Sequence, residues 1–501
     1  MEQYRMYIDG QFVDAESGET RASMNPATEE PVALAPVGTR GDMKRAIEAA
    51  RRAFDSGVWS GMPVGERAQL IYKLVEKIND MDMTRKLGTI ETQDAGFTIS
   101  LSTGGEVPFT AYWMEKAART AECLSSYEPL PWHDFPDVSW SFVNREPIGV
   151  CGGIIPWNHP FMMAGWKLGP ALVMGCTVVL KPASETPLAA LELAKLIDEC
   201  GFPPGVVNIV TGPGSSLGEE LCTHPFVDKV ALTGSTEVGR QVMKMASSTL
   251  KKVTLELGGK SAQIIMPDAD LEVAVEGSLS GVFYHTGQVC VSGTRIFVHE
   301  DIYDEYLESA IAATQTVRIG DPMDFETTMG PLISRGQQET VLRYIEIGKK
   351  EGATVATGGK KPDHLKKGFF VEPTIFTNVH NGMTIAQEEI FGPVVCIIKF
   401  RTVDEAVAMA NDSIYGLGGA VWSRNIPEAI EIAKRVRTGT MWINTYHQLS
   451  PMAPFGGYKQ SGIGREHGVQ GLLEFTQAKH ILVDLGTPLA NRLLHTYVFS
   501  K

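Results

Sequence analysis

The amino-acid sequence predicts an α/β protein that contains a doubly wound parallel sheet. From Ile148 to Gly259, short apolar strands alternate with helical patterns, which is typical of a parallel sheet with helices on both faces. Polar or small residues directly follow four of these strands: Asn158, Lys181, Gly234 and Glu256. Ligands of such sheets bind beyond the carboxyl ends of the strands, so these residues mark a candidate site. A chain of 501 residues is too long for one core, and two or three domains are expected.

The segment before this sheet is predicted to form a hairpin and several helices. An Asp-Gly pair within residues 4–14 is a strong signal for a tight turn between two strands. Residues 39–54 fit a capped helix, with Thr39 or Asp42 near the N-cap. Two amphipathic helices and an extended hairpin are expected to follow, at residues 66–82, 108–124 and 127–146.

The strands of the first sheet are read from short apolar segments. They are GVCGGIIP, TVVLKP, VVNIVTG, KVALTG and VTLELGG, in chain order. The helices between them are expected to start at Pro160, to span 187–200, to start at Ser216, and to follow Gly234.

A second α/β segment is predicted from near Gly258. Its strands are SAQIIM, TRIFVHE, PTIFTNV, PVVCIIKF and TMWIN, and its helices span 270–285, 301–317, 334–351, 403–411 and 427–437. It ends in a glycine-rich loop, PFGGYKQSGIGRE. A strand, HILVDL, and the tail GTPLANRLLHTYVFSK close the chain.

Composition and charge exclude several classes of protein. The 45 basic and 59 acidic residues give a net charge of −14, which argues against nucleic acid or an anionic membrane as partner. The longest uncharged run, 147–166, carries three prolines and is no membrane span. Seven cysteines lie scattered without a CxxC pair or a Cys/His cluster, so neither disulfides nor a metal site are expected. The N-terminus is charged where a signal peptide would be apolar, and a cytoplasmic location is expected.

One thiol and one carboxylate suggest covalent catalysis. Cys290 lies in a Gly-Gln-Val-Cys turn, where Gly287 is expected to let the backbone approach a ligand. Glu256 ends an apolar alternation and precedes two glycines, which are expected to leave room for a water and a cofactor. A thiolate can attack a carbonyl carbon while a nearby base later activates water. The alternatives are a small buried hydrophobic residue for Cys290 and the polar face of a strand for Glu256. For Cys151, Cys176 and Cys396, inside or beside apolar strands, burial is the preferred interpretation.

The motifs LELGGKS and GQVC, in this order and spacing, resemble the two active-site signatures of the NAD(P)-dependent aldehyde dehydrogenase superfamily, of the hydrolytic, non-acylating type. Related motifs run from PWNHP at residue 156 to PFGGYKQSGIGRE at 454. The resemblance implies a dinucleotide-binding domain (1–126 and 147–257), a catalytic domain (258–474) and a β oligomerisation arm with the tail (127–146 and 475–501). It further implies a homodimer or homotetramer that binds NAD and oxidises a small-molecule aldehyde to the carboxylic acid.

The resemblance also assigns catalytic roles. It makes Cys290 the nucleophile and Glu256 the base that hydrolyses the thioester. Asn158 becomes an oxyanion donor together with the Cys290 backbone N–H, although its position before a helix also fits a simple N-cap. Lys167 and Glu466 match a proton path from Glu256 to solvent.

A cofactor site is implied along the strand ends. Lys181 resembles the lysine that reaches the adenosine ribose hydroxyls, the alternative being a solvated strand end. Gly234 and Ser235 form a small-residue turn at a helix N-terminus, which favours pyrophosphate. The upstream TGPGSSLG segment resembles half of a Rossmann fingerprint, but its spacing is wrong and Pro213 lacks a donor, so it is not the predicted phosphate loop. The remaining implied contacts are Ile154, Pro156, Trp157, Ser184, Gly214, Gly218, Thr233, Val238, Leu257, Gly258, Glu389 and Phe391.

The cofactor preference depends on Ser184. NAD-preferring relatives commonly carry a glutamate at this position, and a carboxylate there would repel the 2′-phosphate of NADP. A serine is neutral, so NAD is expected to work and NADP to be tolerated, although Glu185 is the next residue.

A substrate tunnel is implied by the resemblance alone, because aromatic and methionine side chains at such spacing are more often plain core. The matching positions are Met163, Trp166, Tyr284, Val289, Val291, His447, Leu449 and Phe455. They suggest a medium-sized, apolar, aromatic or terpenoid-like aldehyde. The alternatives are a coenzyme-A-acylating semialdehyde dehydrogenase, which commonly lacks the Glu256 base, and a non-catalytic structural homologue.

Overall fold

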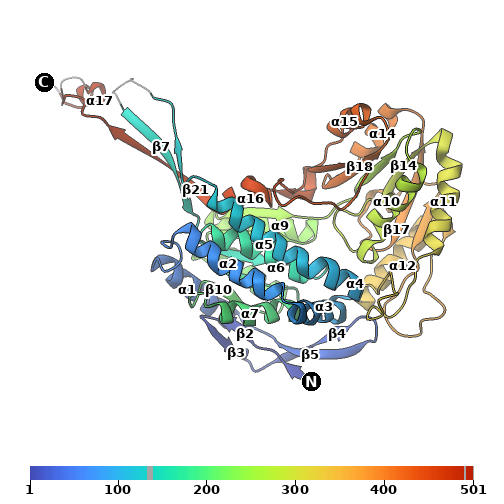
Figure 1. Ribbon diagram of the computed structural model, residues 1–501, viewed down its shortest axis with the longest axis horizontal. Helices are drawn as coiled ribbons and strands as arrows, with labels where there is room; N and C mark the ends of the chain where they lie inside the picture. The colour runs from blue at the N-terminus through green and yellow to red at the C-terminus, as the bar shows by residue number, and fades with distance from the viewer. Residues whose placement is uncertain (133–138, 490–491, 500–501) are drawn as a thin grey trace.

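A computed structural model describes residues 1–132, 139–489 and 492–499. Two large mixed sheets flanked by helices make up the body, a small three-stranded sheet lies near the N-terminus, and a second one forms an arm (Figure 1). The small N-terminal sheet pairs β1 (Glu2–Gln3), β5 (Glu30–Pro36) and β4 (Thr20–Asn25). The α/β class is confirmed.

The first large sheet has five parallel strands at its centre. Its order is β20-β12-β11-β8-β9-β10-β2-β3, and β2, β3 and β20 pair antiparallel at the two edges. The strands are β2 (Met6–Ile8), β3 (Gln11–Val13), β8 (Val150–Ile154), β9 (Thr177–Lys181), β10 (Val207–Ile209), β11 (Lys229–Thr233), β12 (Lys252–Glu256) and β20 (Gly462–Ile463). All five apolar segments predicted as strands of this sheet are present. The edge strand β20, from the glycine-rich loop, is not apparent from the sequence.

Helices cover both faces of this sheet, as a doubly wound fold requires. Along β9 the side chains alternate: Val178 and Leu180 belong to one core cluster and Val179 to another. The first face packs against α6 (Pro160–Val173) and α7 (Leu188–Cys200), over which lie α2 (Val64–Ile78), α3 (Met81–Ala95) and α5 (Val107–Glu122). The second face packs against α1 (Arg40–Asp55), α8 (Glu219–Thr223) and α9 (Thr236–Ala246).

Local signals explain most of the N-terminal elements. The predicted hairpin is confirmed, with its turn residues Asp9 and Gly10 both at positive φ. Thr39 caps α1, and its side chain and that of Asp42 bond each other's backbone N–H groups in a capping box. The helix predicted at 66–82 is present as α2, but it ends at Ile78. Asp80 accepts hydrogen bonds from the first turn of α3, so a new helix begins there.

The second large sheet has the order β15-β16-β17-β14-β13-β18-β19. Its strands are β13 (Ala262–Ile265), β14 (Arg295–His299), β15 (Thr354–Thr357), β16 (Thr374–Thr377), β17 (Val394–Phe400), β18 (Gly418–Trp422) and β19 (Thr440–Ile443). Helices α10 (Leu271–Phe283) and α11 (Tyr303–Gln315) pack on one face, and α12 (Arg335–Lys350), α14 (Val403–Asn411) and α15 (Ile426–Arg435) on the other. All five strands predicted here are present. The buried strand β18 was missed because it begins with two glycines, which are unfavourable in strands.

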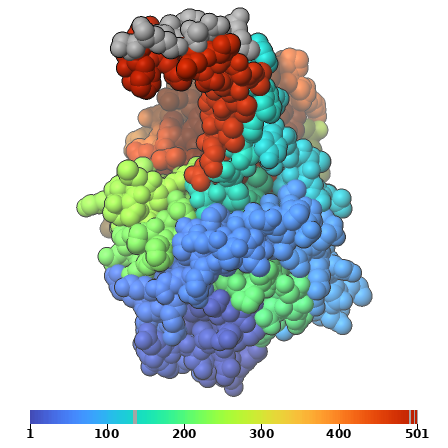
Figure 2. All heavy atoms as spheres, turned by 90° about the vertical axis from the view of Figure 1, so that its left-hand side faces the viewer, coloured from blue at the N-terminus to red at the C-terminus, as the bar shows by residue number. Residues whose placement is uncertain are grey.

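The arm consists of β6 (Tyr127–Pro129), β7 (Ser139–Pro147) and β21 (Thr476–Asp484), in the order β21-β7-β6. The antiparallel pairing of β6 with β7 confirms the predicted hairpin, although its residues 133–138 lie outside the described residues. The arm projects from the body, and the C-terminal segment with α17 (Leu493–Thr496) lies at its outer end (Figures 1 and 2). Within the described residues, each helix is too short or too polar to cross a bilayer.

Candidate active site

A cavity of about 360 Å³ collects most of the predicted site residues. Its lining includes Pro156, Trp157, Asn158, Met163, Trp166, Thr233, Gly234, Ser235, Glu256, Leu257, Gly258, Tyr284, Val289, Cys290, Val291, Glu389, Phe391, His447, Leu449, Phe455 and Glu466. These residues come from the carboxyl ends of strands in the first sheet, from helix α6 and from loops of the second segment. The cavity therefore lies where a doubly wound sheet binds ligands.

Cys290 follows a 3₁₀ turn (Tyr284–Gly287) after α10 and precedes β14. Its side chain faces the cavity and is half-buried, whereas Cys151, Cys176, Cys200, Cys222 and Cys396 are buried and Cys123 is exposed. The burial expected for Cys151, Cys176 and Cys396 is thus confirmed. Burial raises the pKa of the Cys290 thiol to about 12, and the charges of Glu389 and Glu256 act in the same direction. A base must therefore take the thiol proton before the sulfur can react.

Glycines around Cys290 serve the packing of the protein itself. Gly287 has a φ of +73°, and a Cβ there would lie 2.2 Å from the carbonyl oxygen of Gly392. A Cβ on Gly259 would lie 2.3 Å from the carbonyl oxygen of Cys290. The expectation that Gly287 makes room for a ligand is therefore wrong, since the neighbouring chain fills that space.

Asn158 lies beside the Cys290 turn. Its Nδ2 donates a hydrogen bond to the carbonyl oxygen of Gln288 at 2.8 Å, and the residue is buried. The N-cap of α6 is the next residue, His159, so the capping alternative for Asn158 is wrong. An amide group has two N–H donors, and the second is available to an oxygen bound in the cavity.

Glu256 is the last residue of β12 and is buried at the cavity wall. Among the described residues, neither of its carboxyl oxygens has a hydrogen-bond partner. Burial raises its pKa well above the ordinary value, and the charge of Glu466 adds to this effect while Lys167 opposes it. A carboxyl group in this setting readily accepts a proton, as a general base requires.

Lys167 and Glu466 form a buried ion pair next to Glu256. Lys167, on α6, also donates a hydrogen bond to the hydroxyl oxygen of Thr233 at 2.7 Å. Glu466 reaches the cavity, whereas Lys167 lies behind its wall. Both charges thus act on Glu256: Lys167 favours its carboxylate form and Glu466 favours its protonated form.

Glu389 lies opposite, in the loop before β17. It accepts a hydrogen bond from the N–H of Gly259 at 3.0 Å, and burial raises its pKa to about 7. A Cβ on Gly258 would lie 2.2 Å from its carboxylate, so only glycine allows this approach. The glycine pair after Glu256 therefore admits Glu389 and the Cys290 backbone. Because Gly258 also lines the cavity, room there for a water and a cofactor stays a prediction.

Phe391 has a positive φ of 56°, which directs its ring toward Trp157 at 5.2 Å between ring centroids. The Nε2 of Gln337, on α12, donates hydrogen bonds to the carbonyl oxygens of Ile390 and Phe391. Gln337 therefore holds this strained loop in place.

The N-terminus of α9 provides an anion site at the strand ends. Thr233 ends β11, Gly234 follows, and Ser235 caps the helix by accepting from the N–H of Val238. The first N–H groups of a helix and its dipole favour a phosphate group. A Cβ on Gly234 would meet only Leu232, at 3.5 Å, which leaves this turn accessible to a ligand.

The other predicted contacts lie outside the cavity lining, and most are at the carboxyl edge of the sheet. Strand register pairs Ile154 with Lys181. Burial lowers the pKa of Lys181 to about 8, so the solvated alternative for this lysine is wrong. The hydroxyl of Ser184 donates to the carbonyl oxygen of Gly212 at 2.9 Å. Gly214 and Gly218 bound a π-helical turn before α8, and Val238 is exposed on α9.

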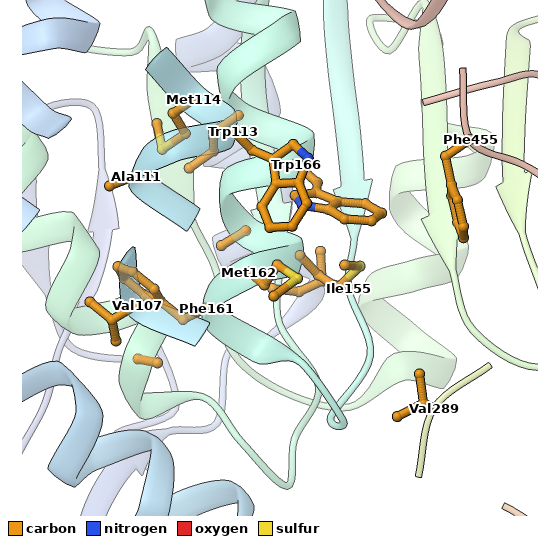
Figure 3. Close-up of a cluster of buried hydrophobic side chains, with 14 of the residues drawn as sticks. Val107, Ala111, Trp113, Met114, Ile155, Phe161, Met162, Trp166, Val289 and Phe455 are labelled. Atoms are coloured by element: carbon orange, nitrogen blue, oxygen red, sulfur yellow. The ribbon is translucent and has the colours of Figure 1, made fainter. Parts of the chain in front are cut away.

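The far end of the cavity is aromatic and apolar. Figure 3 shows Trp113 and Trp166 close together, with Phe455 on the other side of Trp166. Ring centroids of Trp113 and Trp166 are 5.5 Å apart, and those of Trp166 and Phe455 are 5.6 Å apart. His447 bonds the carbonyl oxygen of Gly281, and burial lowers its pKa to about 4, so the ring is neutral.

Several lining residues were not predicted from the sequence: Phe109, Trp113, His159, Met162 and Gln337. Phe109 and Trp113 belong to a helix that was predicted, but nothing in its pattern distinguishes a cavity face from a core face. Met162 and His159 flank predicted residues and could have been found by extending the PWNHP motif along the helix. In the part of the chain that the structure describes, the acidic, histidine and cysteine side chains form no group of three able to hold a metal ion.

Comparisons with known proteins agree with this geometry. The model of the aldehyde dehydrogenase family matches residues 12–481. Betaine aldehyde dehydrogenase of Bacillus subtilis (strain 168) is 44% identical over 483 residues, which are 95% of this chain and 96% of that protein.

Solved structures give the same result. Betaine aldehyde dehydrogenase from Staphylococcus aureus, in complex with NAD+, is similar with a TM-score of 0.95 and 41% identity, over 99% of this chain and 97% of that one. The NAD+ complex of aldehyde dehydrogenase from Bacillus cereus has a TM-score of 0.94 and 44% identity, over 97% of both chains. From the family model and these similarities along nearly its whole length, the chain belongs to the aldehyde dehydrogenase family.

Proposed function

We propose that this protein oxidises an aldehyde to the carboxylic acid with NAD+, through an acyl-enzyme on Cys290 that is hydrolysed by water. The observation that carries the proposal is the meeting of Cys290, Asn158 and Glu256 in one cavity beside the N-terminus of α9. The relatives in the Bacillus cereus and Staphylococcus aureus structures bind NAD+, and the family is named for this reaction.

In this proposal, Cys290 loses its proton and the sulfur forms a bond to the carbonyl carbon. The negative charge passes to the carbonyl oxygen, where the free N–H of the Asn158 side chain and the backbone N–H of Cys290 stabilise it. Glu256 has a raised pKa and no hydrogen-bond partner among the described residues, so its carboxyl is suited to act as the base of the later hydrolytic step.

Glu256 then serves the second half of the reaction. It takes a proton from water, the resulting hydroxide adds to the thioester carbon, and the carbon–sulfur bond breaks to release the acid and the Cys290 thiolate. The Lys167–Glu466 pair then carries the accepted proton toward solvent. This step is supported by the buried position of the pair and by the effect of both charges on the pKa of Glu256.

The residues at the strand ends fit a dinucleotide. The α9 N-terminus offers backbone N–H groups to a pyrophosphate. Glu389 offers a carboxylate to the hydroxyls of one ribose, and Lys181 offers its ammonium group to the hydroxyls of the adenosine ribose. When bound, NAD+ supplies the acceptor for the hydride that leaves the carbon attached to Cys290. Phe391 and Trp157 would bound the nicotinamide side of the cavity, since both line it.

The walls of the cavity support a medium-sized, apolar or aromatic aldehyde, of the terpenoid-like kind, as the substrate. Phe109, Trp113, Trp166 and Phe455 offer rings, and Met162 and Met163 adapt to irregular shapes. Assembly into a homodimer or homotetramer through the arm is part of the same proposal.

The test mixes the protein with NAD+ and a panel of aldehydes, and follows the absorbance of reduced cofactor with and without coenzyme A. The panel includes benzaldehydes, citral and betaine aldehyde, because two of the relatives carry the betaine name. Reduction without coenzyme A, with the carboxylic acid as product, supports the proposal. A strict requirement for coenzyme A would favour the acylating alternative, and no reduction with any aldehyde would favour a non-catalytic homologue.

A further inference from the structure

A buried carboxyl group lies directly behind one wall of the cavity. Glu106 ends a π-helical turn (Ser102–Glu106) just before α5, and its side chain is fully buried. π-turns displace side chains from the helical register and are frequent at functional sites. One oxygen of Glu106 lies 2.8 Å from Nδ1 of His159. The other oxygen has no hydrogen-bond partner among the described residues.

The side chain of His159 does not cap the helix that begins after it. It occupies the N-cap of α6, but its side chain makes no capping hydrogen bond and points to Glu106 instead. Its ring packs near Phe97 at 5.4 Å and Tyr284 at 6.4 Å between centroids. The residue also lines the cavity. Because Nδ1 faces the carboxylate, the Nε2 edge is the polar edge that His159 can offer to a bound molecule.

Tyr284 is a second cavity residue near the same carboxyl. Burial raises the pKa of its hydroxyl, and the charge of nearby Glu106 adds to the shift. The hydroxyl therefore keeps its proton. Its own lone pairs remain for an incoming donor.

His159 and Tyr284 thus both offer a hydrogen-bond acceptor to the cavity. If Nδ1–H of His159 donates to Glu106, Nε2 is an acceptor, and the Tyr284 oxygen is an acceptor as well. The buried negative charge behind both rings reinforces this preference. Aromatic and methionine side chains make up much of the rest of the lining. A charged group would have to lose its hydration against them, whereas a neutral hydroxyl costs far less to bury.

We propose that Glu106, His159 and Tyr284 form a subsite that recognises a hydroxyl group on the carbon skeleton of the aldehyde, and so directs this enzyme toward hydroxylated, in particular hydroxyaromatic, aldehydes. His159 and Tyr284 accept the hydrogen bond, and Glu106 is a positioning residue that orients His159. This inference rests on the proposed oxidation of aldehydes and specifies its substrate class.

The test compares hydroxybenzaldehydes with methylbenzaldehydes of the same substitution, at the 2, 3 and 4 positions of the ring, with NAD+ as oxidant. For at least one position, replacing His159 by Phe should lower the hydroxyl-to-methyl ratio of kcat/KM on the order of 10-fold, as expected for a lost hydrogen bond to a charge-linked group. Electronic effects of the substituents cancel, because the same pair of substrates is compared in both proteins. Glu106→Gln should lower the same ratio through KM more than through kcat, which a general loss of structure would not do.

His447→Phe is the matched control. His447 also lines the cavity and contacts Tyr284, but its Nε2 already bonds Gly281 and it has no contact with Glu106. The hydroxyl-to-methyl ratio of kcat/KM in His447→Phe should stay within about 3-fold of the wild-type ratio. A measurement without variants uses the wild type with the corresponding benzyl alcohols as competitive inhibitors, where a hydroxybenzyl alcohol should bind on the order of 10-fold more tightly than its methyl analogue.

The outcomes separate the two proposals. If aldehydes are oxidised but the ratio is unchanged in His159→Phe, or the two kinds of alcohol inhibit equally, the hydroxyl subsite is refuted and the proposed oxidation stands. If no aldehyde is oxidised, inhibition by the alcohols cannot be measured. Both the proposed oxidation and the hydroxyl subsite, which rests on it, are then overturned.

Discussion

Cys290 is surrounded by groups that hold its thiol in the neutral form. Burial and the charges of Glu389 and Glu256 raise its pKa, so its reactivity depends on transfer of the proton to a base. Cys290→Ala should therefore abolish dehydrogenase turnover while NAD+ binding, followed by calorimetry, changes little. Substantial remaining turnover would contradict the assignment of the nucleophile.

Cys123 provides the matched control, since it is the exposed cysteine of this chain. Iodoacetamide should label both Cys123 and Cys290 in the wild type, and should inactivate Cys123→Ala as completely as the wild type. Inactivation that tracks a labelled peptide around another cysteine would remove Cys290 from the mechanism.

Glu256 is expected to matter most after the first turnover. Glu256→Gln should still produce a rapid burst of reduced cofactor near one equivalent per active site, while steady turnover falls by ~10²–10⁴-fold, the usual contribution of a general base. Rapid-mixing absorbance measurements give both quantities. A steady-state rate equal to that of the wild type would exclude Glu256, and loss of the burst would show that it also takes the thiol proton.

We predict that Glu389 makes the binding of NAD+ depend on pH. Its pKa is raised to about 7 by burial, so the carboxylate fraction falls as the pH drops through 7, and with it the acceptor for the ribose hydroxyls. KM for NAD+ should therefore rise below pH 7, by up to about 10-fold per pH unit. Glu389→Gln should show a high KM that does not follow this trend between pH 6 and 8. A variant with the wild-type pH profile would show that another group controls binding.

At the scale of elements, the strand–helix alternation was predictable because each strand is a short apolar segment with a polar or small residue at its end. Strands β9, β11 and β12 end at Lys181, Thr233 and Glu256, and a parallel sheet brings such ends to one edge. Local sequence therefore contained the first half of the site. The second half, Cys290 and Glu389, was found through motifs that resemble a known family.

The residues that were missed owe their place to tertiary packing. Gln337 lies on α12 and reaches the site only because it bonds the Phe391 loop, and Trp113 reaches it because α5 packs against α6. Neither contact leaves a periodic signal along its own helix. The boundary between α2 and α3 was missed for a local reason, the cap at Asp80, which lies within a continuous helical pattern.

We expect the turn after β9 to set the preference between NAD+ and NADP+. Ser184 is neutral and donates to Gly212, so its lone pairs do not repel a phosphate as a carboxylate would, and buried Lys181 lies three residues earlier. Glu185 is exposed, and its charge acts on Lys181. NAD+ should work and NADP+ should be tolerated. Ser184→Glu should lower kcat/KM for NADP+ far more than for NAD+. Ser184→Gln introduces a side chain of the same size as glutamate but without its charge, and should not discriminate between the two cofactors in this way. Equal losses for both cofactors, or a wild type inert with NADP+, would disprove this role.

At the scale of the whole molecule, the arm exposes an unusual amount of apolar surface. Tyr127, Trp132, Trp140 and Leu482 are all more than half or nearly half exposed, at 60%, 61%, 46% and 51%. Patches of this kind mark interaction surfaces in soluble proteins. We therefore expect the arm to pack against a second copy of the chain, as the proposed homodimer or homotetramer requires.

The C-terminal tail extends this apolar surface. Leu494, Tyr497, Val498 and Phe499 are 61%, 76%, 74% and 64% exposed, and the tail lies at the outer end of the arm (Figure 1). Burial of an exposed apolar segment against another subunit is favourable, and we predict that the tail docks on a neighbouring subunit near the mouth of its cavity. Deleting residues 487–501 should therefore change the association state, measured by sedimentation, or the order of kcat/KM across the aldehyde panel. Replacing the four exposed side chains by serine keeps the length of the tail and should have the same effect, because docking depends on their apolar surface. If both variants retain the mass, the substrate order and the thermal stability of the wild type, the tail does not dock and its apolar side chains stay in solvent.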